Sequence, residues 1–555
     1  MENQQGPSSP DRLAKRHGKD IVNSIFPDTK LSKRTLPEAV FKDFKKYGDN
    51  VALVDGPTGR QYRFSQVQQL VRNVGSGLTR LGFRQGDILC MYSPNLPEYP
   101  LAVLGVLSIG GIVTTANPSY TIDELSHQLS DSEAQYIVAV PQNHDKARAA
   151  AARCKTVKDI FIIDPTSGKG DFSRLVDDDG ARFPENVNIN PMEDVALQPY
   201  SSGTTGLAKG VCLTHSNIVN NMEMAYAQPG LINTGPEDTS IAVLPFFHIF
   251  GMAQVMFSLL RNGAKIVTMP RFDKDMYLSL IQKHKATFNC VVPPIVLFLA
   301  KDPMVENYDL SSLRDMLCGA APLSQDMEES LRRRLGKDCI RQGYGLTETS
   351  PVTHMCPQRT GKRGSIGVLL PNSQAKIVDL ETGFSLGPNQ DGEVCMRGPH
   401  IMKGYHRNLK ATENCIKDGW FHSGDIGHYD EDGYFYIVDR VKELIKYKGF
   451  QVPPAELEGL LLAHPSIADA AVIGIPDKEA GELPKGFVVL KPNCHLTEED
   501  IVSYVTGHVA NYKRLRGGVT IMDAIPKTAS GKILRRVLRT VSFSKSRETR
   551  QHSKL

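Results

Sequence analysis

The sequence lacks the features that mark zinc-binding, disulfide-bonded and membrane-spanning proteins. Its 10 cysteines are scattered over 555 residues with no Cys-x-x-Cys pair, which argues against a zinc site and against a disulfide framework. The longest apolar run, residues 101–116, contains three glycines and is too short to cross a bilayer. Residues 1–30 are polar and carry no apolar core, so no signal peptide is expected there. We therefore expect a thiol-tolerant compartment and no transmembrane segment.

A strong charge bias is also missing. The net charge is +4 at pH 7 and is spread along the chain, so no basic patch for nucleic acid is expected. The apolar fraction of 41% and the charged fraction of 23% are typical of a soluble globular protein. At 555 residues the chain exceeds one ordinary core, so several domains are expected.

One loop, Tyr200-Ser-Ser-Gly-Thr-Thr-Gly-Leu-Ala-Lys-Gly210, concentrates hydroxyls, glycines and a lysine after an apolar stretch. The glycines let the backbone point N–H groups at a ligand, and Lys209 adds a positive charge. The loop therefore predicts a cradle for a polyphosphate. It is not a Walker A loop, because Gly210 stands where that motif needs serine or threonine. A flexible Ser/Gly linker is the alternative that this loop alone leaves open.

Four further segments carry chemistry downstream. Residues 342–349 place a tyrosine ring between two glycines, followed by Glu348, and one carboxylate is sufficient for phosphate-bound Mg²⁺. Asp425 follows a Ser-Gly turn and is suited to ribose hydroxyls, residues 438–449 are basic, and Lys532 follows another Ser-Gly turn. Taken singly, these segments also fit ordinary turns and a solvated charged face.

In their order along the chain, the five segments resemble those of the adenylate-forming superfamily, which includes acyl-CoA synthetases, adenylation domains of peptide synthetases and beetle luciferases. The resemblance runs from about residue 35 to residue 540 and is closest to the 4-coumarate–CoA ligases and their peroxisomal relatives. The supporting stretches are Leu244–Phe250, Val292–Leu297, Gly319–Leu323, Gly392–Gly398 and Ile445–Glu456. Within them, Cys395 is interpreted as a buried structural thiol rather than a nucleophile.

The resemblance implies a ligase that uses ATP, Mg²⁺ and coenzyme A in two steps. A carboxylate attacks the α-phosphate to give acyl-AMP and pyrophosphate, and coenzyme A then takes the acyl group and releases AMP. In-line phosphoryl transfer needs positioning and charge neutralisation, which Lys532 would supply where the new bond forms. The implied ATP- and AMP-binding residues are Ser201, Ser202, Gly203, Thr204, Thr205, Lys209, Gln342, Gly343, Tyr344, Thr347, Asp425, Arg440 and Lys532, with Glu348 as the metal ligand.

The resemblance also implies residues for the acyl group and for coenzyme A. The implied catalytic residues are Lys532, Lys446, Thr347 and His248. The implied acyl-binding residues are Phe250, Gln254, Ala320, Gln342, Gly343, Thr347, Met355, Lys442 and Lys446. Coenzyme A would meet Arg271, Lys448 and Gly449. The related ligases usually have lysine at the position of Arg271, so the charge is kept with an altered geometry.

The acyl substrate is the least determined part of the prediction. Tyrosine is usual at the position of Phe250, which offers no hydroxyl to a phenolic substrate, and Gln254 adds bulk. We therefore expect 4-coumarate to be a poor substrate relative to a less polar acid. Cinnamates, fatty acids and jasmonate-precursor-like cyclopentanone acids remain open, and so does assignment to phenylpropanoid or fatty acid metabolism. A luciferase-like adenylating oxygenase and a non-catalytic binding relative remain the alternative functions.

Alternating strand-like and helical patterns predict an α/β fold with largely parallel sheets covered by helices. One helix is predicted from Ser65 to Gly82 by its 3.6-residue apolar period. The resemblance adds a large N-terminal domain of two α/β subdomains plus a small β-barrel near residues 355–438, then a mobile α+β domain that closes about a hinge at Lys442. The predicted boundaries are a disordered lead over 1–34, the large domain over 35–440, the mobile domain over 441–545 and a tail over 546–555.

The last three residues, Ser553-Lys554-Leu555, form a tripeptide that the peroxisomal import receptor reads, so a peroxisomal location is expected. Deleting these three residues is expected to leave catalysis unchanged and to move the protein to the cytosol, because the tail has no apolar residues at core spacing. Microscopy of an N-terminally tagged protein measures this. Diffuse cytosolic signal from the tagged full-length chain would contradict the address.

Overall fold

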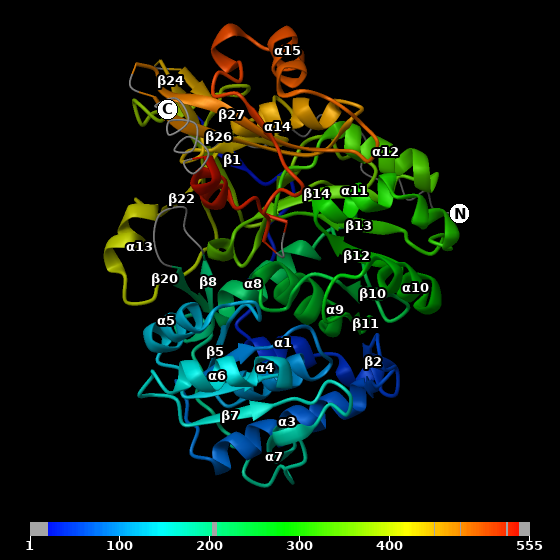
Figure 1. The fold of residues 1–555 in the computed structure, drawn as a ribbon. Helices are drawn as coiled ribbons and strands as arrows, with labels where there is room; N and C mark the ends of the chain where they lie inside the picture. Colours follow the sequence, from blue (N-terminus) through cyan, green and yellow to red (C-terminus); the bar gives the residue numbers. More distant parts are fainter. Residues whose placement is uncertain (1–19, 202–207, 449, 478, 529–530, 543–555) are drawn as a thin grey trace, which may run out of the picture.

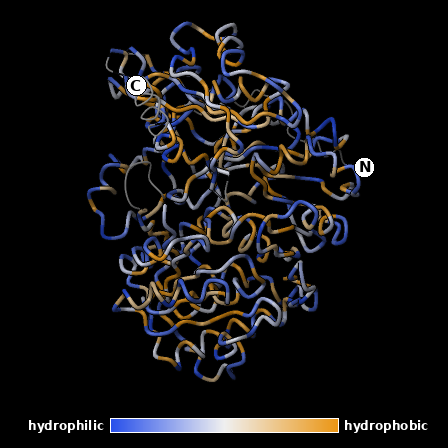
Figure 2. Tube along the Cα trace, in the orientation of Figure 1, coloured by the Kyte–Doolittle hydropathy of each residue, from blue (hydrophilic) through white to orange (hydrophobic). Residues whose placement is uncertain are grey.

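The computed structural model of the chain arranges its sheets in a large domain and a smaller C-terminal domain (Figure 1). The colours of Figure 1 run from two α/β subdomains (blue to green) through an antiparallel subdomain (yellow) to the C-terminal domain (orange to red). Figure 2 shows hydrophobic segments running through the interior of the large domain. The structure describes residues 20–201, 208–448, 450–477, 479–528 and 531–542. The predicted α/β fold class is confirmed.

The first subdomain contains a seven-stranded sheet in the order β20-β9-β8-β5-β4-β6-β7. Strands β8, β5, β4, β6 and β7 run parallel, whereas at one edge β9 runs antiparallel to β8 and β20 runs antiparallel to β9. Parallel neighbours need crossover helices, and these are the helices that cover the sheet. Its elements are β4 (Ile88–Tyr92), α4 (Glu98–Ser108), β5 (Ile112–Thr115), α5 (Ile122–Ser132), β6 (Tyr136–Ala139), α6 (His144–Ala151), β7 (Asp159–Ile162), α7 (Ser173–Val176), β8 (Val195–Ser201), β9 (Lys209–Thr214), α8 (His215–Ala225) and β20 (Gly404–Tyr405).

The helix predicted from Ser65 to Gly82 is present as α3 (Phe64–Arg80). Its apolar face is buried, as the 3.6-residue period requires, and it begins one residue earlier than predicted. Gly82 has a positive φ of 85° just beyond the helix end, the backbone conformation in which glycine commonly stops a helix.

The second subdomain joins a four-stranded sheet, β10-β11-β2-β3, to a five-stranded sheet, β12-β13-β14-β15-β16. The Thr287 amide donates to the Thr239 carbonyl (2.8 Å) where the two sheets meet. Its elements are α1 (Leu36–Phe41), α2 (Phe44–Tyr47), β2 (Val51–Asp55), β3 (Gln61–Arg63), β10 (Thr239–Ala242), the π-helix η3 (Phe250–Phe257), α9 (Ser258–Arg261), β11 (Lys265–Thr268), α10 (Lys274–His284), β12 (Phe288–Val291), α11 (Pro293–Lys301), β13 (Asp315–Cys318), α12 (Gln325–Leu335), β14 (Ile340–Gly345), β15 (Val352–Met355) and β16 (Val368–Leu369).

The antiparallel subdomain corresponds to the predicted barrel and includes a strand from the predicted disordered lead. Val22 is buried (2% exposed) in β1, which pairs with β17. The prediction of a disordered lead is therefore wrong for residues 20–34, which the structure describes. Burial of the apolar Val22 side chain against the sheet removes it from water, and this stabilises the ordered strand. The elements are β1 (Val22–Asn23), β17 (Gln374–Val378), β18 (Ser385–Leu386), β19 (Gly392–Arg397), α13 (Leu409–Cys415), β21 (Ile416–Lys417), β22 (Trp420–Tyr429) and β23 (Phe435–Arg440).

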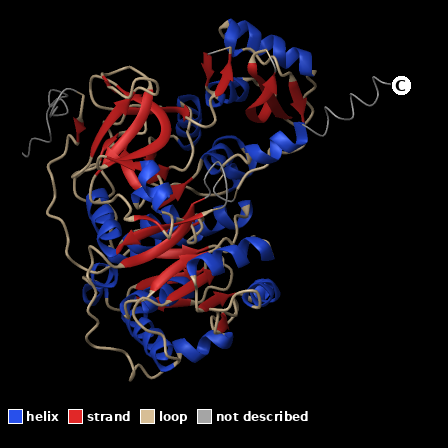
Figure 3. Cartoon of the chain, turned by 90° about the vertical axis from the view of Figure 1, so that its left-hand side faces the viewer, coloured by secondary structure: helices blue, strands red, loops and turns tan. Residues whose placement is uncertain are grey.

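The C-terminal domain has its own five-stranded sheet and its own buried apolar cluster. Figure 3 shows it projecting from one end of the large domain. The sheets of the two domains part between Arg440 and Ile445, where the boundary is predicted. Its elements are β24 (Ile445–Tyr447), β25 (Phe450–Val452), α14 (Pro454–Ala463), β26 (Ile467–Asp477), β27 (Gly481–Leu490), α15 (Glu498–His508), β28 (Val519–Ile521) and a helical stretch over 535–542.

Some predicted features fall outside the described residues. They are the loop residues Ser202, Gly203, Thr204 and Thr205, the coenzyme A position Gly449, and the tripeptide Ser553-Lys554-Leu555. Within the described part of the chain, no helix is both long and apolar enough to cross a bilayer.

Candidate functional site

The phosphate loop connects two antiparallel neighbours of the first sheet. Strand β8 ends at Ser201, which pairs directly with Lys209 at the start of β9. The pairing fixes both ends of the loop, so Lys209 emerges beside the position from which the predicted cradle begins. The apolar stretch before the loop is therefore a strand, and β8 and β9 pair as antiparallel neighbours on either side of the loop.

Tyr405, on β20, connects Lys209 to Glu348. The Lys209 ammonium lies 4.2 Å from the centre of the Tyr405 ring, within the range of a cation–π contact. The Tyr405 hydroxyl donates to Glu348 Oε1 (2.8 Å), and Glu348 is buried. Burial and the Glu348 charge raise the pKa of Tyr405, which keeps the hydroxyl protonated as a donor. The sequence analysis missed this residue, and its only signal was the short segment Lys403-Gly-Tyr405.

Asp425 lies between Tyr344 and Arg440. The Tyr344 hydroxyl donates to Asp425 Oδ2 (2.6 Å), and Arg440 Nε lies 3.2 Å from Asp425 Oδ1. Asp425 and Arg440 face each other directly in the β22–β23 ladder, which explains the pairing. Burial raises the pKa of Asp425, while Arg440, Tyr344 and Lys532 oppose that shift. Three predicted nucleotide-binding residues therefore meet at one place.

An irregularity in the β19–β22 ladder presents Asp425. Pairing shifts register between Glu393, opposite Ile426, and Cys395, opposite His422, so the intervening turn bulges out. Glu393 Oε1 accepts the amide of Gly424 (3.0 Å), and its Oε2 lies 2.7 Å from His422 Nδ1. The carboxylate thus holds the turn that carries Asp425.

Cys395 is buried beside this turn, with its Sγ 3.3 Å from His422 Nδ1. Burial raises the pKa of the Cys395 thiol to about 12, which keeps it protonated at neutral pH. A neutral, buried thiol is a poor nucleophile. The interpretation of Cys395 as a structural residue agrees with this environment.

Lys532 reaches the large domain from the C-terminal domain. The pKa of Lys532 is lowered to about 8, first by desolvation and then by the Arg440 charge, while Asp425 and Glu348 oppose the shift. These interactions bring Lys532 together with the metal-ligand and ribose candidates. Next to Lys532 in sequence, Gly531 approaches α11 so closely that an added Cβ would lie 3.0 Å from Pro294 Cγ.

His248 lies between the nucleotide and acyl candidates. Its Nδ1 accepts the Phe250 amide (3.3 Å), which leaves the proton on Nε2 in the neutral ring. Burial lowers the pKa of His248 to about 4, and the Lys532 charge acts in the same direction. His248 is therefore a neutral hydrogen-bond donor at physiological pH.

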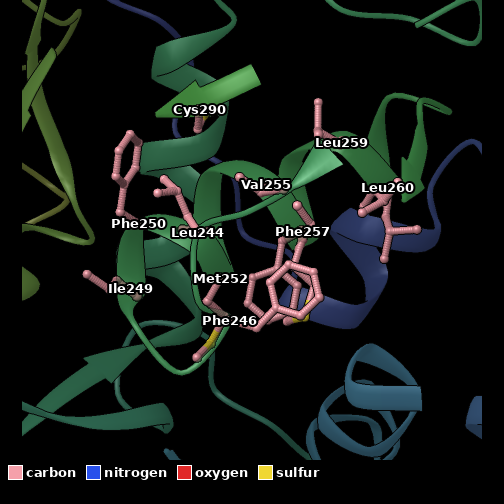
Figure 4. Close-up of a cluster of buried hydrophobic side chains, with 14 of the residues drawn as sticks. Leu244, Phe246, Ile249, Phe250, Met252, Val255, Phe257, Leu259, Leu260 and Cys290 are labelled. Carbon is pink, nitrogen blue, oxygen red and sulfur yellow. The ribbon is translucent and has the colours of Figure 1, made fainter. Parts of the chain in front are cut away.

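The predicted acyl-binding residues come together around η3 and the ends of β13 and β14. A Cβ added to Gly319 would lie 3.2 Å from both the Phe250 ring and the Gly343 carbonyl, and Met355 pairs with Gly343 in the ladder. Ala320 follows Gly319 with a positive φ of 70°. Figure 4 shows Phe250 apart from Phe246 and Phe257 in the apolar cluster.

Gln254 lies one turn of η3 beyond Phe250 and is fully buried. Its Nε2 donates a long hydrogen bond to Asn221 Oδ1 (3.4 Å), and Asn221 in turn donates to the Val352 carbonyl (2.6 Å). Gln254 Oε1 accepts no hydrogen bond from any residue that the structure describes. It is thus an available acceptor beside the acyl candidates.

Gln342 binds protein rather than facing the site with a free amide. Its Nε2 donates to the Leu323 carbonyl (3.0 Å) and to Glu328 Oε1 (2.8 Å), and its Oε1 accepts the Leu323 amide (3.2 Å). Burial raises the pKa of Glu328 to about 7. The contribution of Gln342 to ligand binding stays a prediction. In the structure its hydrogen bonds to Leu323 hold the loop that contains Gly319 and Ala320.

The remaining predicted residues differ in how exposed they are. Thr347 is half-buried in the turn that carries Glu348. Arg271, Lys442, Lys446 and Lys448 are all exposed. Lys446 is on β24 and Lys448 follows that strand with a positive φ of 47°, so both cations belong to the segment from β24 to β25.

The chain is similar to known ligases over most of its length. It is 45% identical to 4-coumarate–CoA ligase 1 of Petroselinum crispum over 529 residues, covering 94% of this chain and 96% of the relative. It is 42% identical to the probable 4-coumarate–CoA ligase 1 of Dictyostelium discoideum over 548 residues, covering 95% and 98%.

Solved structures share the fold. ATP-bound MatB from Rhodopseudomonas palustris matches with a TM-score of 0.83 at 27% identity, over 91% of this chain and 98% of that one. The anthranilate CoA ligase AuaEII matches with a TM-score of 0.85 at 24% identity, over 93% and 99%, a likeness that concerns the fold alone.

Family profiles cover both domains. The profile described as AMP-binding enzyme matches residues 40–406, and the profile described as AMP-binding enzyme C-terminal domain matches residues 456–532. The chain therefore belongs to the AMP-binding enzyme family, as an AMP-forming acid–CoA ligase of the 4-coumarate–CoA ligase type.

Proposed function

We propose that the protein makes an acyl-CoA in two steps, with Lys532 serving adenylate formation and Lys446 serving transfer to coenzyme A. One observation carries this proposal. Lys532 of the small domain is half-buried near Asp425, Glu348 and Arg440 of the large domain, where desolvation is the main cause of its lowered pKa. A buried cation contributed across a domain boundary costs desolvation, and an anionic ligand at the same place would offset that cost.

In the first step the protein's task is to neutralise and align the reacting phosphate and carboxylate oxygens. Lys209 and the loop beside it face the outer phosphates, and Lys532 stabilises charge at the α-phosphate. Asp425 and Arg440 hold the ribose. Neutral His248 donates from Nε2 toward the carboxylate end of the acyl group.

Glu348 fits Mg²⁺, because Mg²⁺ bound to nucleotide phosphates takes one or two protein carboxylates. The carboxylate is buried, and its Oε1 is oriented by the Tyr405 hydroxyl. When bound, Mg²⁺ neutralises charge on the phosphate oxygens and on the leaving pyrophosphate.

In the second step the exposed face of the C-terminal domain replaces the buried one. Lys446 and Lys448 are exposed, whereas Lys532 is half-buried against the large domain, so we assign the two sets of lysines to different steps. We infer that rotation about Lys442 exchanges them and brings Lys448, Gly449 and Arg271 to coenzyme A.

The acyl substrate that fits best has an apolar end. Phe250 contacts the Gly319–Gly343 region with a ring that has no hydroxyl, and Met355 is fully buried beside it. Cinnamates and fatty or cyclopentanone acids meet this requirement better than phenols.

The named ligase relatives favour this function over a luciferase-like oxygenase, which light emission with luciferin and ATP would reveal. ATP binding without AMP formation would support a non-catalytic relative.

The two lysines should separate the half-reactions. Lys532→Ala is expected to lower adenylate formation roughly 10²–10³-fold while leaving thiolysis of supplied acyl-AMP largely intact, and Lys446→Ala should show the reverse. Because the pKa of Lys532 is lowered to about 8, its charge is lost as pH rises through that value. The kcat/KM for adenylate formation should therefore fall above about pH 8. Equal losses in both half-reactions would contradict the assignment.

Tyr405 should contribute to adenylate formation through Glu348. Tyr405→Phe removes the hydroxyl but keeps the ring, and a hydrogen bond to a charged group is worth about 1.5–3 kcal/mol, so kcat/KM for ATP is expected to fall about tenfold or more. Tyr434→Phe is the matched control, because Tyr434 also has a lysine over its ring and a bonded hydroxyl, at Lys362 and Thr360. Equal pyrophosphate release by the two variants would exclude the role.

The pocket argument is tested with 4-coumarate, cinnamate and a medium-chain fatty acid in pyrophosphate-release assays. A buried phenol without a partner costs about 1–3 kcal/mol, so 4-coumarate should have a kcat/KM roughly 5- to 150-fold below the best apolar acid. Phe250→Tyr should narrow this gap. A wild-type preference for 4-coumarate would point to Gln254 Oε1 as the acceptor of the phenol, and the Phe250 argument would then be wrong.

A further inference from the structure

Lys532 is carried by a short hairpin whose described arms are residues 526–528 and 531–534. Lys527 and Ile533 form an antiparallel bridge, and the Thr528 amide donates to the Lys532 carbonyl (2.8 Å). The Lys532 amide donates to Thr528 Oγ1 (3.1 Å). These few bonds join the two described arms of the hairpin. They do not fix its orientation on the domain, which depends on what holds its two ends.

Each end of the hairpin carries a cation paired with an acid of the C-terminal domain. Lys527 Nζ lies 2.8 and 2.7 Å from the two carboxylate oxygens of Asp469 on β26. Arg535 directly follows the hairpin, and its guanidinium lies 2.7 Å from Glu458 Oε1 on α14, with side chains only 16% and 12% exposed. The two ion pairs tie opposite ends of the hairpin to two different elements.

Glu458 is itself held in place. Its Oε1 also accepts the amide of Val472 (2.9 Å) on β26, so α14, β26 and the hairpin meet at one carboxylate. Burial raises the pKa of Glu458 to about 6, and Arg535 is the principal group that opposes this shift. Nearby, Asp439 raises this pKa and Lys527 lowers it. Arg535 therefore favours the ionised form of Glu458, and the Glu458 carboxylate in turn pairs with the Arg535 charge.

Arg535 also contacts the segment that follows the predicted hinge. Glu443 Oε2 lies 3.6 Å from Arg535 Nε and 3.4 Å from Arg539. Glu443 is one residue beyond Lys442, in a turn closed by its amide to the Arg440 carbonyl (2.9 Å). One guanidinium thus lies between α14, the hairpin and the turn beside the hinge.

We propose that Arg535 and Lys527 are positioning residues, which hold the hairpin so that Lys532 meets the reacting oxygens when the domains close. This inference rests on the proposed role of Lys532 in adenylate formation. The apolar side of the hairpin packs on a small cluster that includes Ile525 and Leu538. Apolar packing is non-directional, whereas the ion pairs at the two ends restrict rotation of the hairpin. A displacement of about 1 Å can cost on the order of 10²-fold in rate.

A purely structural role makes a different prediction. If the ion pairs only stabilised the C-terminal domain, their loss would weaken both half-reactions together, because Lys446 belongs to the same domain. A positioning role affects only the step that uses Lys532. The two roles are therefore separated by measuring the half-reactions individually.

The test compares Arg535→Met with Arg535→Lys and with the matched control Arg536→Met. Arg536 is exposed and forms no ion pair with any residue that the structure describes. Pyrophosphate release measures adenylate formation, and acyl-CoA formation from supplied acyl-AMP measures thiolysis. Arg535→Met should slow adenylate formation roughly 10- to 100-fold with thiolysis unchanged, Arg535→Lys should recover part of the loss, and Arg536→Met should match the wild type in both steps.

Wild-type adenylate formation by Arg535→Met, or equal loss in both steps, would overturn the proposal. If Arg535→Met does not fold, Lys527→Met supplies the same comparison at a less buried pair, in which both side chains are 25% exposed. Failure of the proposed function is distinguishable, because the wild-type protein would then release no pyrophosphate with any acid.

Discussion

The half-buried charge of Lys532 is the interaction that joins the C-terminal domain to the candidate site of the large domain. The C-terminal domain brings an ammonium into surroundings that otherwise contain Asp425, Glu348 and Arg440, and burial is the largest influence on its pKa. Isolated charges are not buried without compensation. The acids of the large domain supply part of that compensation, and an anionic ligand would add to it. Ligand binding and domain closure are thus linked through one side chain.

The large domain prepares the site through contacts made before any ligand arrives. Asp425 and Glu348 are each oriented by a tyrosine hydroxyl, from Tyr344 and Tyr405, and Glu393 holds the bulged turn that presents Asp425. The two tyrosines come from strands of different sheets, β14 and β20. Pre-oriented polar groups need little rearrangement as charge develops, which is the usual source of rate enhancement in phosphoryl transfer.

The sequence predicted the parts of the molecule in which local pattern and tertiary structure agree. The apolar period of α3 and the apolar stretch that forms β8 before the phosphate loop appear with shifts of at most a few residues. Motif residues such as Asp425 and Lys532 come together as the family resemblance implies. Tyr405 and Arg535 escaped prediction because their importance lies in contacts between segments far apart in sequence. The order of residues 20–34 was also not predicted, because a two-residue strand is too short to show an apolar period and its partner is far away in sequence.

That short N-terminal strand has a consequence for how the protein is made. Asn23 and Gln374 are neighbours in the sheet although 351 residues separate them, a distance that ribosomes translating 5–20 residues per second cover in roughly 20 to 70 s. During this time β1 has no partner, and the apolar side chain of Val22 has no sheet to cover it. The antiparallel subdomain is therefore completed late by the earliest part of the chain. This sheet can be completed only after β17 has been synthesised. Until then the β1 segment stays unpaired and can be bound by chaperones.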